Sequence, residues 1–467
     1  MLIEIHMIQN HSPSNLNRDD LGAPKTCVFG GVTRARISSQ CLKRAIRNPG
    51  NSDDVHNRGR SIFADAMREF IGRRTKFFPK LVEETLELEN SKIPAADHSK
   101  IVKQCKEIAK KEKEGDRAGK SSDEAEVDDR PRTAQLLFLG LSEAQDFVKR
   151  LEQMRLDKEW GKCYEKWLEG KLKDTGPTSF LGELSKGWKR RSVDIALFGR
   201  MTTSDAFKDV EAAMQVAHAF STHAVVNEVD YFTAVDDLGK SGGGAGHVDE
   251  SLYNSACFYK YFCLDLEQLI KNLGGDCSEA DGREAKLAAR KEAKLADGKE
   301  AKRLAARKEA EPLAAAALGH FLRAAALTTP TGKQNSFAAH NPPDGILVEI
   351  KQTNIPASYA NAFAEPVDPG SEGGLVGQSV RQLGQYVREI SNGYGIHGER
   401  LWFSPSGRYR LTWVDRQAKP EQEKPVVEPP DHVIDNFETL VERVVCKATG
   451  LQWSDVKDAG RVERKEA

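Results

Sequence analysis

The sequence lacks an excess of either charge. Its 69 Lys and Arg residues are balanced by 70 Asp and Glu residues, which gives a formal net charge of −1 at pH 7. Proteins that bind a polyanion across a broad surface are normally basic, so any such surface on this chain must be local. A local surface binds a polyanion more tightly when several copies or neighbouring subunits contact the same molecule, because each neutralised phosphate adds to the affinity.

Cysteine pairing motifs and long apolar runs are also missing. The 8 cysteines are scattered, with no C-x-x-C and no Cys/His spacing typical of zinc sites. This usage is typical of reduced thiols in the cytosol. No segment approaches the roughly 20 apolar residues that a membrane-spanning helix needs, and the strand-like start MLIEIHMIQN does not resemble a signal peptide. We therefore expect a cytoplasmic protein that does not enter a membrane.

Catalytic signatures are absent from the sequence as well. The glycine-rich run at 241–246 is not followed by Lys-Ser or Lys-Thr, so it fails as a phosphate-binding loop. His218 and His223 lack the H-E-x-x-H spacing and are interpreted as ordinary surface or packing histidines. Asp236 and Asp237 are adjacent, and in a strand they would point to opposite faces, which is a poor geometry for sharing one metal. We predict no catalytic residue, no metal site and no cofactor.

Positive charge is concentrated between residues 17 and 47, where seven Lys or Arg stand against two Asp. Arg34 and Arg36 are two apart, so in an extended segment they share one face. Ser38 or Ser39 can cap a helix in which the residues at i, i+3, i+4 and i+7 form one polar stripe. That stripe comprises Gln40, Lys43, Arg44 and Arg47. A solvated amphipathic helix explains the charge pattern alone, but the Gly-Gly turn and the hydroxyls beside the helix start favour phosphate binding.

The rest of the chain is expected to combine strands with helices. Strands are predicted at 2–8, 193–199, 225–235, 254–266 and 346–350. Helices are predicted at 313–327, at 376–390, and after Ser204 or Asp205 with Phe207, Val210, Met214 and Ala217 on the apolar face. Residues 50–185 are expected to be mostly helical around a polar loop at 115–132, and the EAK repeats within 281–310 predict an exposed arm. This order fits an α+β fold built on a βαββαβ ferredoxin-like sheet with enlarged connections.

Several long motifs occur along the chain in a fixed order. They are HSPSNLNRDDLGAPKTCVFGG with TRARISSQCLKRAIR, VDIALFGRMTTS at 193–204, DYFTAVDDL at 230–238, KQNSFAAHNPPD at 333–344 and NGYGI at 392–396. Together they resemble the CasC family, the multi-copy backbone subunit of the type I-E CRISPR surveillance complex called Cascade. The resemblance implies a palm like an RNA-recognition motif, a helical fingers insertion and a β-hairpin thumb. The expected segments are a palm at 1–49, 190–223, 252–278 and 312–400, fingers at 50–189, a thumb at 224–251, an Ala/Lys/Glu-rich insertion at 279–311, and a C-terminal segment with a charged tail at 401–467.

The resemblance also implies a function, which is to polymerise along a CRISPR RNA and present it for pairing with a target DNA strand. The implied partners are further copies of the chain (six in the family), the other Cascade subunits and a recruited helicase-nuclease. On this reading the guide backbone is bound by Arg18, Lys25, Arg34, Arg36, Ser38, Gln40, Lys43, Arg44 and Arg47. Met201, Phe232 and Thr233 would separate one guide base from the next, since stacking on an aromatic face tolerates any base.

Two other classes of function remain open. A metal-dependent ribonuclease would use Asp236 or Asp237, and a general RNA-binding protein would bind many transcripts. In the related type III backbone proteins an aspartate just before the basic helix cleaves RNA, and Thr33 stands at that place here. A Thr does not ligate Mg²⁺ as a carboxylate does, which argues against the nuclease. Asp19 and Asp20 are interpreted as a pair that fixes a turn.

Overall fold

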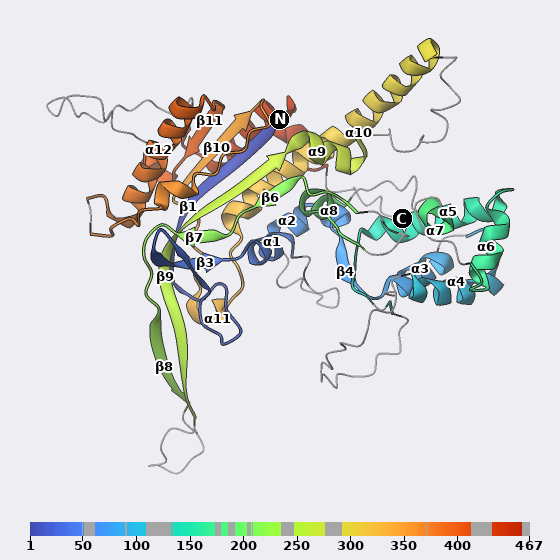
Figure 1. Cartoon of the computed structure of the whole chain (residues 1–467), viewed down its shortest axis with the longest axis horizontal. Helices are drawn as coiled ribbons and strands as arrows, with labels where there is room; N and C mark the ends of the chain where they lie inside the picture. The colour runs from blue at the N-terminus through green and yellow to red at the C-terminus, as the bar shows by residue number, and fades with distance from the viewer. Residues whose placement is uncertain are drawn as a thin grey trace. The chain divides into compact units, whose positions relative to one another are not determined.

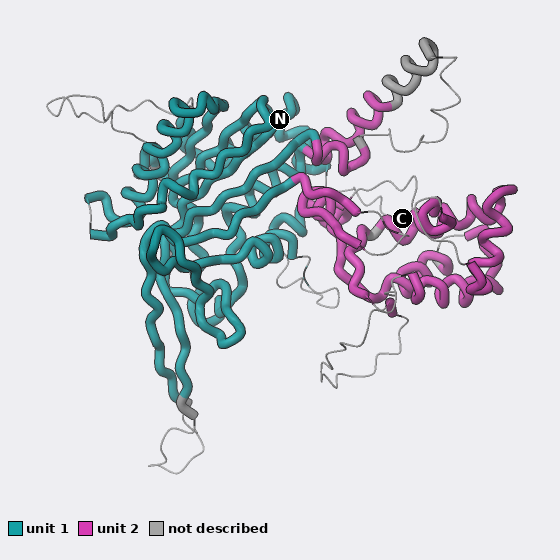
Figure 2. Tube along the Cα trace, viewed as in Figure 1, with its two compact units in different colours: residues 1–66, 214–267, 315–459 teal, residues 67–213, 268–314, 460–467 magenta. Residues whose placement is uncertain are grey.

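The fold was analysed in a computed structural model, in which the chain forms two compact units (Figure 2). The structure describes residues 1–48, 50, 61–88, 91–108, 132–133, 135–172, 179–184, 192–202, 207, 209–234, 247–275, 292–370, 372–411 and 432–459. Unit 1 comprises residues 1–66, 214–267 and 315–459, and unit 2 comprises residues 67–213, 268–314 and 460–467. None of the helices in the described part of the chain is long and apolar enough to span a membrane.

Unit 1 is built on a ten-stranded sheet with the order β12-β11-β10-β1-β9-β7-β3-β2, to which β6 and β8 add by pairing with β9 (Figure 1). Every neighbouring pair is antiparallel except β11 and β12. The strands are β1 (Leu2–Ser14), β2 (Thr26–Phe29), β3 (Val32–Ile37), β6 (Met214–Val216), β7 (Ala219–Ser221), β8 (Glu228–Ala234), β9 (His247–Asp265), β10 (Gly345–Lys351), β11 (Glu399–Phe403) and β12 (His432–Ile434).

Strand β1 occupies the centre of this sheet, and its residues 2–9 are buried on both faces. One face packs under helix α12 (Gly374–Tyr394), where Leu2 and Ile8 share a core with Val380 and Leu383. Phe262 of β9 packs edge to face on Phe321 of helix α10 (Glu292–Leu327), with the ring centroids 5.5 Å apart. Helix α13 (Phe437–Thr449) contacts β10 and β11. The predicted strands at 2–8 and 346–350 and helices at 313–327 and 376–390 are confirmed.

Under α12 the sheet carries a buried polar layer. Glu349 accepts a hydrogen bond from Arg400 Nε at 2.7 Å, and its other carboxylate oxygen accepts one from the Tyr359 hydroxyl at 2.7 Å. Glu4 is paired with Lys351, which is fully buried. Although burial opposes its charge, the neighbouring His6, Lys351 and Arg400 groups hold the pKa of Glu349 below its usual range. These charges are therefore stabilised by one another inside the fold.

The remaining helices of unit 1 are short. They are α1 (Ser39–Arg47), α2 (Ile62–Ala66), α9 (Leu266–Ile270, which ends in unit 2), α11 (Gln334–Phe337) and α14 (Trp453–Val456), with 3₁₀ turns at Ala360–Phe363 and Pro405–Gly407. Strands β11 and β12 and helix α13 place residues 401–403 and 432–449 of the C-terminal segment in unit 1.

Unit 2 is mainly helical, as expected for most of 50–185. It contains α3 (Phe78–Leu88), α4 (Ala95–Glu107), α5 (Leu141–Leu156), α6 (Gly161–Leu168), α7 (Phe180–Leu184), α8 (Val193–Phe198), a two-stranded sheet of β4 (Arg73–Thr75) and β5 (Leu137–Leu139), a 3₁₀ turn at Arg68–Phe70 and a π turn at Lys271–Gly275. Its core is centred on Phe78, which packs edge to face on Phe147 at 5.3 Å and on Phe207 at 5.1 Å.

Two predicted elements are wrong. Residues 193–198 of the predicted strand at 193–199 form helix α8 instead. Asp194 lies in the first helical turn, and Gly199, with φ of 78°, ends the helix in a conformation that glycine adopts easily. The helix predicted through 207–217 is absent from its described residues. Val210 bridges to Arg200, and Met214 pairs with Leu264 of β9, so sheet pairing overrides the helical spacing of the apolar residues.

Candidate nucleic-acid interface

The basic segment folds as the hairpin β2–β3 followed by α1. Gly30 and Gly31 form the turn with φ of 62° and 78°, and a Cβ at position 30 would lie 1.7 Å from the Ala364 carbonyl oxygen. Position 30 therefore requires glycine. Helix α1 is capped by Ser38, whose Oγ accepts a hydrogen bond from Cys41 N at 3.3 Å, as predicted for Ser38 or Ser39.

The polar stripe of α1 is narrower than predicted. Leu42 and Ile46 are buried as expected, and Gln40 and Arg44 are exposed. Lys43 is half-buried, and this burial lowers the pKa of its ammonium. Arg47, however, is only 8% exposed. Its buried side chain is poorly placed to reach a phosphate, because the last turn of the helix packs toward the interior.

Arg34 is the second predicted ligand that the structure places inside the fold. Its side chain has no exposed surface (0%). Its guanidinium donates to four backbone carbonyls, those of Phe29 at 3.1 Å, Ser221 at 3.2 Å, Phe363 at 2.8 Å and Ala364 at 3.4 Å. Arg34 thus ties the β2–β3 turn to β7 and to the turn at Ala360–Phe363. Arg34, which we predicted to contact a guide phosphate, is thus placed in the interior and not on the accessible surface.

Arg36, two residues further along β3, is half-exposed. Its Nε donates to the Thr26 carbonyl at 3.1 Å, and its Nη1 lies 3.2 Å from Nδ1 of His218, an exposed residue between β6 and β7. The backbone of Lys25 is fixed beside it, because Arg36 N donates to the Lys25 carbonyl at 2.8 Å. The loop before Lys25 is held by Asp19, whose Oδ1 accepts from Leu21 N and Ala23 N at 2.9 Å, so the turn-fixing role of Asp19 is confirmed.

The accessible polar residues of this region come from the segment before β2, from β3 and from α1, and β3 and β2 form one end of the strand order of unit 1. We call them the basic edge. The basic edge consists of Arg18, Lys25, Arg36, Gln40, Lys43 and Arg44. Sequence reasoning missed His218 as its neighbour, because only sheet pairing brings the segment between β6 and β7 next to β3.

The predicted thumb is a hairpin of β8 and the first part of β9, with pairing from Glu228↔Tyr253 to Ala234↔His247. It projects from the sheet of unit 1 (Figure 1). Tyr231 is 71% exposed and Phe232 is 45% exposed. Cross-strand partners share a face, so Phe232 lies with Asp249, and Thr233 lies on the opposite face.

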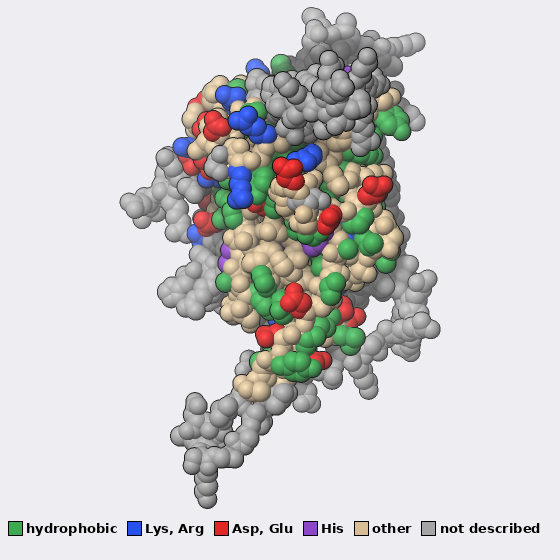
Figure 3. All heavy atoms as spheres, turned by 90° about the vertical axis from the view of Figure 1, so that its left-hand side faces the viewer, with side chains coloured by type: hydrophobic (Ala, Val, Ile, Leu, Met, Phe, Trp, Pro, Cys, Tyr) green, Lys and Arg blue, Asp and Glu red, His purple; other side chains and the backbone are tan. Residues whose placement is uncertain are grey.

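The hairpin carries no Lys or Arg in 228–234 or 247–253, and its exposed acidic residues include Glu228, Asp230 and Asp249. Figure 3 shows hydrophobic and acidic side chains over this part of the surface. A hairpin of this composition repels phosphate and offers apolar contact instead. Asp236 and Asp237 lie outside the described residues.

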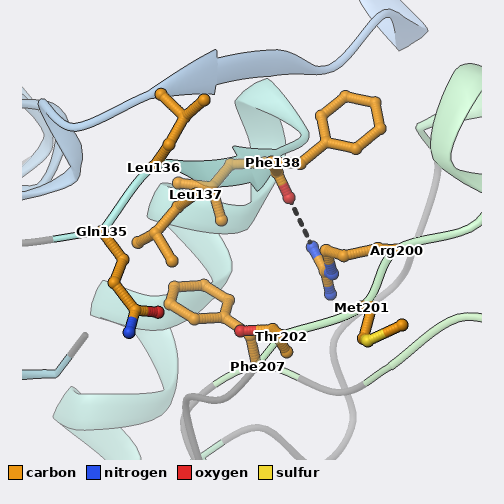
Figure 4. A pocket seen from close by; sticks show the side chains of 9 residues that line it. Gln135, Leu136, Leu137, Phe138, Arg200, Met201, Thr202 and Phe207 are labelled. Atoms are coloured by element: carbon orange, nitrogen blue, oxygen red, sulfur yellow. Dashed lines mark hydrogen bonds between the residues drawn. The ribbon is translucent and has the colours of Figure 1, made fainter. Parts of the chain in front are cut away.

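Met201 belongs to unit 2 and is 92% exposed. It lies beside a small cavity of about 150 Å³ lined by residues 135–139, Arg200, Thr202 and Phe207 (Figure 4). Arg200 is held in place there, since its Nη1 donates to the Phe138 carbonyl at 3.0 Å and to Glu143 at 2.8 Å. Met201 therefore extends from a fixed backbone, while Phe232 and Thr233 are part of unit 1.

No group of three or more His, Cys, Asp or Glu that could hold a metal ion occurs among the described residues. Thr33 is exposed on β3, and its carbonyl accepts from Val225 N at 3.0 Å. All the described cysteines are free thiols, and Cys277 lies outside the described residues.

Residues 3–426 match the model of the family described as CT1975-like protein. The chain belongs to this family. The CT1975-like chain is also similar to a chain of a solved "CRISPR RNA-guided surveillance complex, pre-nicking", with 25% sequence identity, a TM-score of 0.63, and coverage of 96% of this chain and 100% of that one. A chain of a second "CRISPR RNA-guided surveillance complex" is 21% identical with a TM-score of 0.49, at the same coverage. No curated protein matches the sequence.

Proposed function

We propose that this CT1975-like chain is a non-catalytic subunit that binds guide RNA, polymerises along it in a type I-E CRISPR surveillance complex, and presents it for pairing with target DNA. The observation that carries the proposal is the basic edge, a group of accessible cations and amides in a chain whose net charge is near zero. The similarity over 96% of the chain to a subunit of a CRISPR RNA-guided surveillance complex supports the same function.

The order of the central strands supports a palm of the RNA-recognition-motif type. In a βαββαβ unit the first strand lies between the fourth and the third, and the second lies beyond the third. Here β10, β1, β9 and then β6 with β7 follow this order. Helix α1 connects the first strand to the second in sequence, and α10 connects the third to the fourth. The fingers would then correspond to the helices of unit 2, and the thumb to the β8–β9 hairpin.

The division of charge suggests how the subunit handles RNA. The basic edge would bind sugar and phosphate, which fixes register without reading sequence. The acidic hairpin would avoid phosphates and place Phe232 against bases, with Thr233 on its other face. Met201, an exposed residue of unit 2, is proposed as a further contact to bases. Sequence would then be read by base pairing between guide and target. Further copies of the chain, other complex subunits and a recruited helicase-nuclease complete the proposed partners.

Sequencing the RNA that co-purifies with the full-length chain tests this function. A guide-binding subunit retains one repeat-derived set of RNAs, whereas a general RNA-binding protein retains many unrelated transcripts. Incubating the same preparation with Mg²⁺ or Mn²⁺ distinguishes the ribonuclease, because a non-catalytic subunit leaves guide and target intact. Recovery of unrelated transcripts, or metal-dependent cleavage, would contradict the proposal.

A further inference from the structure

His218 lies against the basic edge in a geometry that determines which ring nitrogen carries the proton. The guanidinium of Arg36 offers only donors, so at 3.2 Å the Nδ1 of His218 must accept the hydrogen bond. A neutral imidazole that accepts at Nδ1 carries its proton on Nε2. The exposed His218 therefore has an N–H donor that the bond to Arg36 does not use.

The surroundings of His218 keep it in this neutral form. Partial burial, followed by the positive charges of Arg36 and Lys25, lowers the pKa of the imidazole below its ordinary value of 6.5. At neutral pH the side chain is thus an uncharged donor among cations. An uncharged N–H can bind a phosphodiester oxygen or a ribose hydroxyl without adding to the charge of the surface.

We propose that His218 is a further RNA-binding residue, which accepts a hydrogen bond from Arg36 through Nδ1 and donates from Nε2 to the sugar-phosphate backbone of single-stranded RNA. This inference rests on the proposed function. It extends the basic edge from β3 and α1 to the segment between β6 and β7, so that RNA on this edge touches three separate segments of unit 1. The competing explanation is that His218 only positions Arg36.

Two substitutions separate these explanations. His218→Asn keeps an acceptor close to the position of Nδ1 but has no donor where Nε2 lies. His218→Gln places an amide N–H near the position of Nε2. We expect His218→Asn to weaken binding of a labelled single-stranded RNA of mixed sequence by about two- to tenfold, the value of one hydrogen bond. His218→Gln should retain nearly wild-type affinity.

The salt dependence provides a second readout. Because neutral His218 releases no counterion, the slope of log K against log salt should stay unchanged in His218→Asn, whereas Arg36→Gln should lower its magnitude by about 0.7. His397→Asn, at another exposed histidine, serves as the matched control. Wild-type affinity in His218→Asn overturns the inference. Weaker binding with a lower slope in His218→Gln but not in His218→Asn assigns His218 to positioning alone, because only Asn keeps the acceptor for Arg36.

Failure of the proposed function gives a different result. If the double variant Lys43→Glu with Arg44→Glu also leaves RNA binding unchanged, the basic edge does not bind RNA. The proposed guide-binding function is then contradicted as well. If that double variant loses affinity while the His218 variants do not, only the inference about His218 is overturned.

Discussion

Replacing Arg34 and Arg36 separately by Met tests whether Arg34 stabilises the interior of the fold while Arg36 belongs to the basic edge. Both are arginines of β3, two residues apart, but only Arg34 is fully buried. Arg34→Met keeps an apolar stem and removes the donors to Ser221 and Phe363, which lie in the interior. It also removes those to Phe29, which is half-exposed, and Ala364, which is exposed. A buried carbonyl left without a donor costs about 1–3 kcal/mol, so two of them, with the Phe29 and Ala364 carbonyls rescued by water, should reduce the free energy of unfolding by about 2–6 kcal/mol.

Urea unfolding followed by circular dichroism measures this loss, and fluorescence anisotropy with labelled RNA measures affinity for the folded protein. Arg36→Met is the matched control. It should change the free energy of unfolding by less than about 0.5 kcal/mol and weaken RNA binding with a lower salt slope. Wild-type stability of Arg34→Met combined with weaker RNA binding would refute the reasoning, since Arg34 would then act as a ligand and not as a clamp.

The other predictions concern the hairpin, helix α1 and the polar layer. Phe232→Ala should leave the unfolding midpoint of the free protein nearly unchanged, because a core phenylalanine would cost about 3–5 kcal/mol, and chemical probing of the assembled guide should lose its periodic reactivity. A large drop in the midpoint would assign Phe232 to the core. Lys43→Glu with Arg44→Glu should weaken RNA binding equally for unrelated sequences and lower the salt slope by at least about 1.4, measured by anisotropy at several salt concentrations. An unchanged slope would contradict phosphate binding. Because the folded pKa of Glu349 is depressed, its contribution to stability is present above its unfolded pKa of about 4.3 and is lost as the pH falls below it. Glu349→Gln should therefore destabilise the protein by about 3–5 kcal/mol at neutral pH and show a smaller further loss in acid, checked by urea unfolding between pH 7 and pH 3.

Elements with a strong local signal could be predicted from the sequence. Helix α12 and the cap of α1 follow from apolar spacing and from a serine at the right position. The strand assigned to 193–199 is wrong because composition outweighed the signals at its ends, Asp194 in the first turn and Gly199 after the last. The helical spacing of apolar residues also gave a wrong prediction at Met214. Its strand conformation depends on pairing with Leu264, fifty positions away in the chain.

The candidate site shows the same limit at the level of single side chains. The sequence located the basic segment, but it treated Arg34 and Arg36 alike because alternation places them on one face. The two arginines differ in their partners: Arg34 donates to the carbonyl of Phe363, and Arg36 lies against the ring of His218. Both partners come from distant segments of the chain. Side-chain burial and tautomer depend on those neighbours, so neither follows from spacing along one strand.

The covering of the central strands by α12 determines where this protein can meet a ligand. His6 stacks on Tyr359 at 4.5 Å and on Tyr261 at 5.0 Å, a set of rings that could accept bases on an open sheet. These rings lie in the interior together with Glu4 and Glu349. A nucleic acid would have to displace a helix of 21 residues to reach them. On the proposed function, nucleic acid would therefore bind elsewhere, at the basic edge and the β8–β9 hairpin, where substitutions can alter binding while this interior stays untouched.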